Sequence, residues 1–374
     1  MRERQAILDA YGELARKGGR AVLATVVRVQ GSAYRRPGAR MLLLPDGITI
    51  GTVSGGCLEG DVKVRARRTI TEGTKIVVRY DSTASGEMVR ELGLGCEGVV
   101  DVLMEPLDAG AKNGPLELLR HCLTRHEAGV IARVLAVEGQ ASANVGDFLT
   151  LDQRGCCEHD FAEPELASQV QVDALNVLKG QRSRSATYRL PEGRVDVFLE
   201  SVLPPPPLIV CGAGHDAVPL VRFAKELGWW VAVLDQPANA TEEFVKRVPS
   251  ASRGAAVIMS HSYRNDLHYL RALLPSPLRY LGVLGPRNRT ERLLRCLEAE
   301  GLSYASTHTQ RVYGPAGLDI GADSPEEIAL AILAEIGAVI AGRTGQSLRD
   351  RDSPIHDRAG DLATTAGEDR EQRA

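Results

Sequence analysis

Two cysteines flanked by glycines are the residues of this sequence best suited to sulfur or metal chemistry. Cys57 follows Gly55 and Gly56 in a glycine-rich turn that leads into a predicted helix over 57–70. The helix dipole at such a position favours a thiolate, which can attack an electrophile, carry sulfur or bind a soft metal. Cys96 lies between glycines ahead of a predicted strand. Single cysteines are more often small buried residues, so core packing is the alternative for both.

A second glycine-rich turn is suited to binding a phosphate. An apolar run leads directly into residues 212–217, which read G-x-G-x-x-A and open a predicted helix. Gly212 allows the tight turn, and Gly214 lets the main chain approach a phosphate at the helix N-terminus. Asp235 ends the next predicted strand, 21 residues after Gly214, where a carboxylate can bind a ribose. His215 is expected to be a neutral imidazole that donates or accepts a hydrogen bond to a ligand, or else a residue that caps or packs against the helix. The alternative for the motif is a tight turn without a ligand.

Further polar residues follow the next two predicted strands. His261 follows the strand over 256–260, and Arg287 and Arg289 follow the strand over 280–285. Ligands of open α/β sheets bind beyond the carboxyl ends of the strands, so position favours a functional role for these side chains. The arginines can hold a phosphate through their forked donors, and the alternative for each is a solvated helix start.

Composition excludes several classes of protein. Lys and Arg number 45 and Asp and Glu 48, so no basic field predicts a nucleic-acid partner. No apolar run is long enough for a membrane span, and the N-terminus does not read as a secretory signal. The seven cysteines are an odd number without a CxxC pair, which favours a reducing cytoplasm. No GxxxxGK[ST], HExxH or GxSxG motif supports a P-loop NTPase, zinc protease or α/β-hydrolase.

The elements that must position these residues differ between the two halves. The first half predicts helices at 3–17, 57–70, 115–126 and 165–179, and strands at 21–29, 39–44, 48–53, 75–80, 98–107, 129–138 and 147–152. The second half predicts strands at 208–212, 231–235, 256–260 and 280–285 that alternate with helices at 215–227, 241–248, 264–274 and 287–300. A last helix is expected from Ser324, which has the residues of a capping box.

Alternating strands and helices of this length predict a parallel, doubly wound sheet. We therefore expect an α/β protein with an N-terminal mixed α+β domain over 1–203 and a C-terminal Rossmann-like domain over 204–345. The run of prolines from 204 to 207 marks the boundary, and a polar tail over 346–374 is expected to be disordered. The stretch 110–200 is weakly assigned, and no internal repeat is evident.

The order of several motifs resembles that of the xanthine dehydrogenase accessory factors, the XdhC/CoxI family. The resemblance covers about 20–107 and 204–342. It rests on residues 31–33, 35–41, 51–59, 95–98, 212–215, 260–261, 282–289, 317–321 and 325–329.

The resemblance implies a cytoplasmic chaperone of molybdenum cofactor rather than a stand-alone catalyst. Such a protein holds molybdopterin while a cysteine desulfurase installs the terminal sulfur, and inserts it into the apoenzyme of a molybdenum hydroxylase such as xanthine dehydrogenase. Its phosphate is expected on the turn at 212–215, and the metal or its sulfur at Cys57 or Cys96. The full set of expected cofactor-binding residues is Gly55, Gly56, Gly212, Gly214, His215, Asp235, His261, Arg287 and Arg289.

Three alternatives stay open at this point. The Rossmann-like domain could serve an NAD(P)-dependent oxidoreductase, although no acid–base pair marks a hydride site. A sulfurtransferase could carry a persulfide on Cys57 or Cys96. A scaffold could dock desulfurase to hydroxylase without binding the cofactor. A homodimer is compatible with the sequence and is not required by it.

Overall fold

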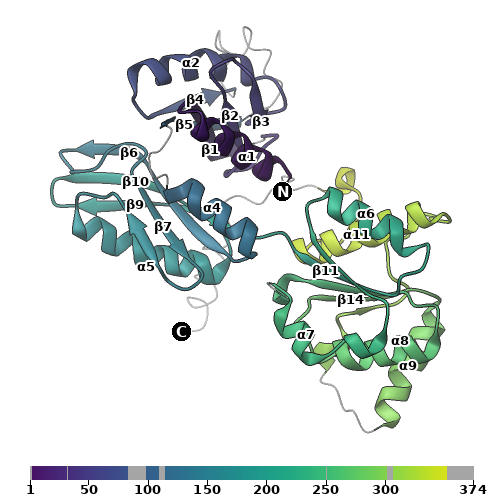
Figure 1. Ribbon diagram of the computed structural model, residues 1–374. Coiled ribbons are helices and arrows are strands. Elements are labelled where there is room, and N and C mark those ends of the chain that lie inside the picture. Colours follow the sequence, from purple (N-terminus) through teal and green to yellow (C-terminus); the bar gives the residue numbers. More distant parts are fainter. Residues whose placement is uncertain are drawn as a thin grey trace. The chain divides into compact units, whose positions relative to one another are not determined.

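The computed structural model divides the chain into two compact units, one built on residues 3–203 and the other on 204–350 (Figure 1). The structure describes residues 2–31, 33–82, 98–108, 114–249, 251–300 and 306–351. Cys96 and most of the tail over 346–374 lie outside these ranges, apart from a short 3₁₀ turn at Leu348–Asp350.

The N-terminal unit contains two five-stranded antiparallel sheets with the same strand order. The first, β3-β2-β1-β5-β4, is built from α1 (Arg2–Arg16), β1 (Arg20–Gly31), β2 (Arg40–Leu43), β3 (Thr49–Gly51), α2 (Glu59–Glu72), β4 (Ile76–Asp81) and β5 (Gly98–Asp108). The second, β8-β7-β6-β10-β9, is built from α4 (Gly114–Arg125), β6 (Gly129–Gly139), β7 (Phe148–Asp152), β8 (Cys157–His159), α5 (Pro164–Gly180), β9 (Arg184–Leu190) and β10 (Gly193–Val202).

The two sheets are an internal repeat, so the expectation that the chain has none is wrong. Leu23 of β1 pairs with Leu42 of β2, and the residues 108 positions later, Ile131 and Thr150, pair in β6 and β7. The spacing persists to Tyr80 and Tyr188 in β4 and β9, and falls to 95 residues in β5 and β10. We call residues 2–108 the first copy and residues 114–202 the second copy.

Backbone details repeat along with the strands. Helix α2 ends at Gly73 in the left-handed conformation, and its N–H bonds to the carbonyl of Thr69. Helix α5 ends 108 residues later at Gln181, which is also left-handed and bonds to Val177. The C-cap geometry is therefore kept where the glycine that favours it has been replaced.

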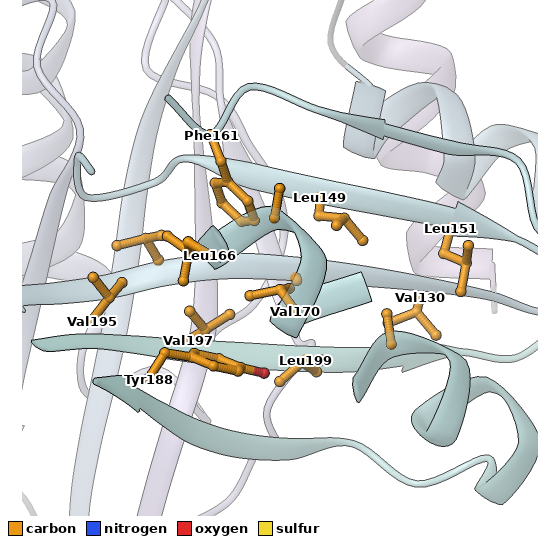
Figure 2. Packing of buried hydrophobic residues seen from close by; sticks show 14 of the residues in the cluster. Val130, Leu149, Leu151, Phe161, Leu166, Val170, Tyr188, Val195, Val197 and Leu199 are labelled. Carbon is orange, nitrogen blue, oxygen red and sulfur yellow. The ribbon is translucent and has the colours of Figure 1, made fainter. Parts of the chain in front are cut away.

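Each copy buries its own core between its sheet and its long helix. In the second copy, Leu149 and Val197 of the sheet pack with Leu166 and Val170 of α5, and Phe161 joins them from the segment before this helix (Figure 2). In the first copy the corresponding cluster includes Met41, Leu58 and Val62.

Charged side chains are buried where the two copies meet. Glu105 of β5 and Glu200 of β10 hold corresponding places, 95 residues apart, and each binds an arginine of the other copy. Arg40 forms a two-pronged ion pair with Glu200, and their side chains are 5% and 4% exposed. Arg133 bonds to Glu105 at 3.1 Å. Because a buried charge is costly without a partner, these pairs specify how the copies pack.

The C-terminal unit is a parallel sheet of order β12-β11-β13-β14-β15 with helices on both faces (Figure 1). Its elements are β11 (Pro207–Cys211), α6 (Ala217–Glu226), β12 (Trp230–Leu234), α7 (Glu242–Arg247), β13 (Ala255–Ile258), α8 (Tyr263–Leu273), β14 (Tyr280–Val283), α9 (Arg287–Ala299), α10 (Ser306–Thr309), β15 (Val312–Tyr313) and α11 (Pro325–Ala341), with 3₁₀ turns at Pro237–Asn239 and Ala251–Arg253. Helices α6 and α11 pack on one face, and α7, α8 and α9 on the other. The expected Rossmann-like doubly wound fold is confirmed.

Local signals explain where α11 begins. Ser324 accepts a hydrogen bond from the N–H of Glu327, whose carboxylate binds back to the N–H of Ser324, as the capping-box pattern predicted. Ile332 and Ile336 on the inner face are fully buried against the sheet. Within the described part of the chain, no helix combines the length and the apolarity needed to cross a bilayer.

Candidate functional site

Cys57 lies in a turn that replaces the first turn of a helix. In the second copy, α5 begins at Pro164, and proline is well suited to the first helical position. The corresponding residue of the first copy is Gly56, which has φ +118°, and α2 begins only at Glu59. Gly55, Gly56 and Cys57 therefore remain outside the helix and are exposed.

A hydrogen-bonded carboxylate holds this turn in shape. Glu59 accepts the N–H groups of Val53 and Ser54 at 3.2 and 2.9 Å and the hydroxyl of Ser54. Ser54 Oγ in turn accepts the N–H of Leu58 at 3.0 Å and lies 3.5 Å from the Cys57 thiol. Burial opposes ionisation of Glu59, but the hydrogen bonds from Ser54 and the main chain outweigh it and lower the pKa of the carboxyl. The turn thus depends on an ionised Glu59.

The Cys57 turn borders a pocket of the first copy, which we call the slot. It measures about 400 Å³ including its open mouth, and its lining residues are Ala33, Tyr34, Arg35, Val53, Ser54, Cys57, Leu58, Tyr80, Ser82, Gly98 and Val100. Tyr80 donates its hydroxyl to Asp61 at 2.7 Å, and burial together with this bond raises its pKa, so it stays a phenol. Arg35 pairs with Glu3, and the Tyr34 ring is 71% exposed beside Gly55. The walls are therefore mostly apolar and the mouth is polar.

The other described cysteines are placed differently. Cys122 and Cys211 are buried, and burial raises the pKa of Cys122 to about 12 and that of Cys211 further. Cys296 contacts the Tyr263 hydroxyl at 3.2 Å. Cys157 is the first residue of the edge strand β8, and Cys156 precedes it. Among the described thiols, only Cys57 lines the slot. Within the same residues no three His, Cys, Asp or Glu side chains form a group that could hold a metal ion.

The glycine turn after β11 lies where a doubly wound sheet binds ligands. With this strand order the topological switch point falls between β11 and β13, and ligands bind outside the carboxyl ends there. His261, after β13, bonds through Nε2 to Asp216 Oδ2 at 2.7 Å, so the two loops meet. Gly212 has φ +120°, and a Cβ there would lie 2.7 Å from the Met259 carbonyl oxygen, so only glycine fits.

Asp216 is a residue of this edge that the sequence analysis did not single out. It precedes α6 without capping it, and its Oδ1 is buried with no hydrogen-bond partner. A Cβ on Gly214 would lie 2.7 Å from this oxygen. The dipole of α6 favours a negative charge at its N-terminus, whether that of Asp216 or that of an anionic ligand. A phosphate on this turn would therefore lie next to the Asp216 side chain. His215, in the turn, and Asp235, directly after β12, are both exposed.

The two arginines after β14 have different surroundings. Arg289 donates to Asp266 through Nη2 at 2.6 Å and Nε at 3.1 Å, and Asp266 is only 1% exposed. Asp266 also accepts the Ser260 hydroxyl, so this cluster ties α8 and α9 to the end of β13. Arg287 is 83% exposed and pairs with Glu291 one helical turn away. The structure thus brings His261 to the glycine turn, holds Arg289 on a buried carboxylate and leaves Arg287 at the surface.

Both units match models of a known protein family. The XdhC Rossmann domain model matches residues 208–336, and the XdhC and CoxI family model matches residues 14–81. A Bacillus subtilis (strain 168) protein, named as a probable subunit of xanthine dehydrogenase, is 33% identical over 334 residues, which span 84% of this chain and 92% of that protein. The "Molybdenum cofactor insertion chaperone PaoD" of Escherichia coli (strain K12) is 24% identical over 339 residues, 90% of this chain and 89% of that one.

A solved structure agrees with these matches. The crystal structure of a xanthine dehydrogenase from Bacillus halodurans has a TM-score of 0.70 and 27% identity, and the match covers 90% of this chain and 96% of that one. The Cys57 turn lies within the segment that the family model matches, and the turn after β11 lies within the matched Rossmann domain. The chain belongs to the XdhC and CoxI family.

Proposed function

We propose that this protein is a cytoplasmic accessory factor that binds molybdenum cofactor, holds it for sulfuration by a cysteine desulfurase, and inserts it into a molybdenum hydroxylase. The names of two relatives support this role, since one is named for xanthine dehydrogenase and the other as a chaperone for molybdenum cofactor insertion. The observation that carries the proposal is Cys57, an exposed thiol that the Ser54–Glu59 hydrogen bonds hold at the mouth of the slot.

The chemistry of Cys57 suits such a cargo. A thiolate is a soft ligand, and molybdenum and its terminal sulfur are soft partners. The thiol is accessible and its turn is fixed by hydrogen bonds, so it can approach a bound metal without reorganising the fold. Alanine at this position removes the sulfur and little packing, which makes Cys57→Ala a clean test.

The test is to purify the full chain from cells that make the cofactor and to measure pterin and molybdenum per chain. We expect both in the unaltered protein and a loss of at least about tenfold in Cys57→Ala, with unchanged far-UV circular dichroism. Cys156→Ala, which alters an exposed thiol away from the slot, is the matched control and should retain both. Absence of pterin and molybdenum from the well-folded unaltered protein would contradict the proposal.

The glycine turn after β11 is proposed to bind the phosphate of the cargo. The proposed donors are main-chain N–H groups of the turn ahead of α6, and Gly214 keeps the approach free of a side chain. Gly214→Val should therefore lower pterin retention. Titration with NAD and NADP separates this role from that of an oxidoreductase, because saturable micromolar binding together with hydride transfer would favour the dehydrogenase instead.

A persulfide-carrying role uses the same thiol and gives a different product. In that reaction the Cys57 thiolate attacks the outer sulfur of a donor persulfide, a Cys57 persulfide forms, and the donor leaves as its thiolate. Mass spectrometry after incubation with a desulfurase and cysteine would show one added sulfur atom on the peptide that contains Cys57. Such an adduct in protein that retains neither pterin nor molybdenum would favour the sulfurtransferase.

A further inference from the structure

The two copies of the N-terminal unit allow the slot to be compared with its counterpart in the same chain. Five lining positions of the slot carry the same residue type in both copies. In the first copy these residues are Ala33, Leu58, Tyr80, Gly98 and Val100, and in the second they are Ala141, Leu166, Tyr188, Gly193 and Val195. The framework around the slot is therefore the shared part of the repeat.

Two positions on this framework differ in size. Val53 of the first copy corresponds to Phe161, and Ser82 corresponds to Leu190. Phe161 and Leu190 are 7% and 8% exposed and belong to the core of the second copy. Figure 2 shows the Phe161 ring among the core side chains, near Leu166. The second copy thus fills, with a benzyl and an isobutyl group, the position that is a pocket in the first.

The rim positions differ in chemistry rather than size alone. Tyr34, Arg35, Ser54 and Cys57 line the slot, and the second copy has Ser142, Ala143, Ala162 and Glu165 in their places. The first copy therefore carries an aromatic ring, a guanidinium, a hydroxyl and a thiol around the mouth of a pocket with apolar walls. Such a combination suits a flat ligand with apolar faces and polar edges.

We infer that the slot binds a planar heteroaromatic ring, in the position that the Phe161 ring takes in the second copy. This inference rests on the proposed function, under which the ring is the pterin of the cargo. The roughly 400 Å³ of the slot includes the open solvent at its mouth, so the slot takes one ring system and not the whole cofactor. The ring lies between the apolar walls, and its substituents leave through the mouth past Cys57.

The variant that tests the inference comes from the second copy. Val53→Phe introduces the side chain that the same framework already accommodates at position 161, so the fold has a precedent for it. Ser82→Leu introduces the second filling group. The matched control is Val64→Phe, the same enlargement at a residue of α2 that is 62% exposed and does not line the slot.

The first measurement is pterin per chain in full-length protein from cells that make the cofactor. Val53→Phe and Ser82→Leu should each retain at least about tenfold less than the unaltered protein, since a filled pocket excludes the ring. Val64→Phe should retain the normal amount. If both slot variants keep their urea midpoints and their full pterin content while Cys57→Ala loses it, the ring inference is wrong although the function stands.

The second measurement needs neither cargo nor a variant. The probe is 6-hydroxymethylpterin, which has the ring without molybdenum, dithiolene or phosphate. Saturating probe should slow alkylation of Cys57 by N-ethylmaleimide at least about threefold, because the thiol lies at the mouth of the occupied slot. Unchanged alkylation of Cys57 would overturn the inference. Protection by the probe, together with absence of pterin and molybdenum from unaltered protein made in cells that produce the cofactor, would support the ring site and contradict the proposed function.

Discussion

Replacing Glu200 by alanine should make the N-terminal unit unfold at a clearly lower urea concentration. Glu200 accepts from Arg40 Nη1 at 2.9 Å and from Nη2, and Arg40 also donates to the Gly38 carbonyl at 2.8 Å. The Arg4 guanidinium lies 3.8 Å from the same carboxylate. Removing Glu200 therefore leaves one buried cation without its partner and a second one close by.

The magnitude follows from the burial of the pair. With side-chain exposures of 5% and 4%, loss of one partner leaves a charge out of water and uncompensated, which costs about 3–5 kcal/mol. This is a large part of the roughly 5–15 kcal/mol that stabilises a typical domain. At about 2–3 kcal/mol per molar urea, the midpoint of the N-terminal unit should fall by roughly 1–2.5 M.

Two spectroscopic signals separate the units. The chain has two tryptophans, Trp229 and Trp230, and both lie in the C-terminal unit. Tryptophan fluorescence therefore follows that unit, while far-UV circular dichroism follows both. We expect Glu200→Ala to shift the circular dichroism transition and to leave the fluorescence transition within error.

A double replacement tests whether the cost comes from the unpaired charge. In Arg40→Met with Glu200→Leu, both charges are gone and the volume is kept, so stability should return to within about 1 kcal/mol of the original or exceed it. A Glu200→Ala shift below about 0.5 M with an unchanged slope, or a double variant as unstable as the single one, would refute this reasoning.

Three further outcomes are expected. Glu59→Gln should lower the urea midpoint of the N-terminal unit at pH 7. Folding lowers the pKa of Glu59, so its stabilising effect is present above its unfolded pKa of 4.5 and is lost as the pH falls through the folded pKa. The difference in urea midpoint from the unaltered protein should therefore shrink below pH 4.5. Phe161→Ala should destabilise the N-terminal unit by about 3–5 kcal/mol in urea denaturation, because it leaves a cavity in the core of the second copy. A cost under about 1 kcal/mol would show that this ring is not packed as described. Gly212→Ala should lower the stability that fluorescence follows by about 1–3 kcal/mol through its positive φ and the nearby Met259 carbonyl, and the part of the circular dichroism change that does not coincide with fluorescence should keep its midpoint.

The C-terminal unit was readable from sequence because its signals are local. Each strand is a short apolar run, and each helix has its own start and stop residues, so α8 and α9 lie within one residue of the predicted ranges. The glycine turn follows from the same reading, since a strand, two glycines and a helix in that order allow few other geometries. The ion pair between Arg289 and Asp266 was not readable, because the two residues are 23 positions apart and meet only when α8 and α9 pack.

The duplication in the N-terminal unit shows the opposite case. Over most of their length the copies share only scattered residues, such as Val22 with Val130 and Gly38 with Gly146. The strands β9 and β10 were missed, although G-x-V-D-V occurs at both 98–102 and 193–197 and could have revealed the relation. A shared fold constrains which positions are apolar and which backbone angles are positive much more than it constrains residue identity.

The sequence by itself determined the reactive group, the phosphate-type turn, the order of elements and the family, because each depends on residues that are neighbours along the chain. Only the tertiary structure decided that Cys57 opens on a pocket, that the corresponding position of a second copy is filled by Phe161, and that Asp216 shares the glycine turn with His261. The physical reason is that a cavity and a buried ion pair are properties of packing between distant segments, and packing is set by the whole fold and not by any local pattern.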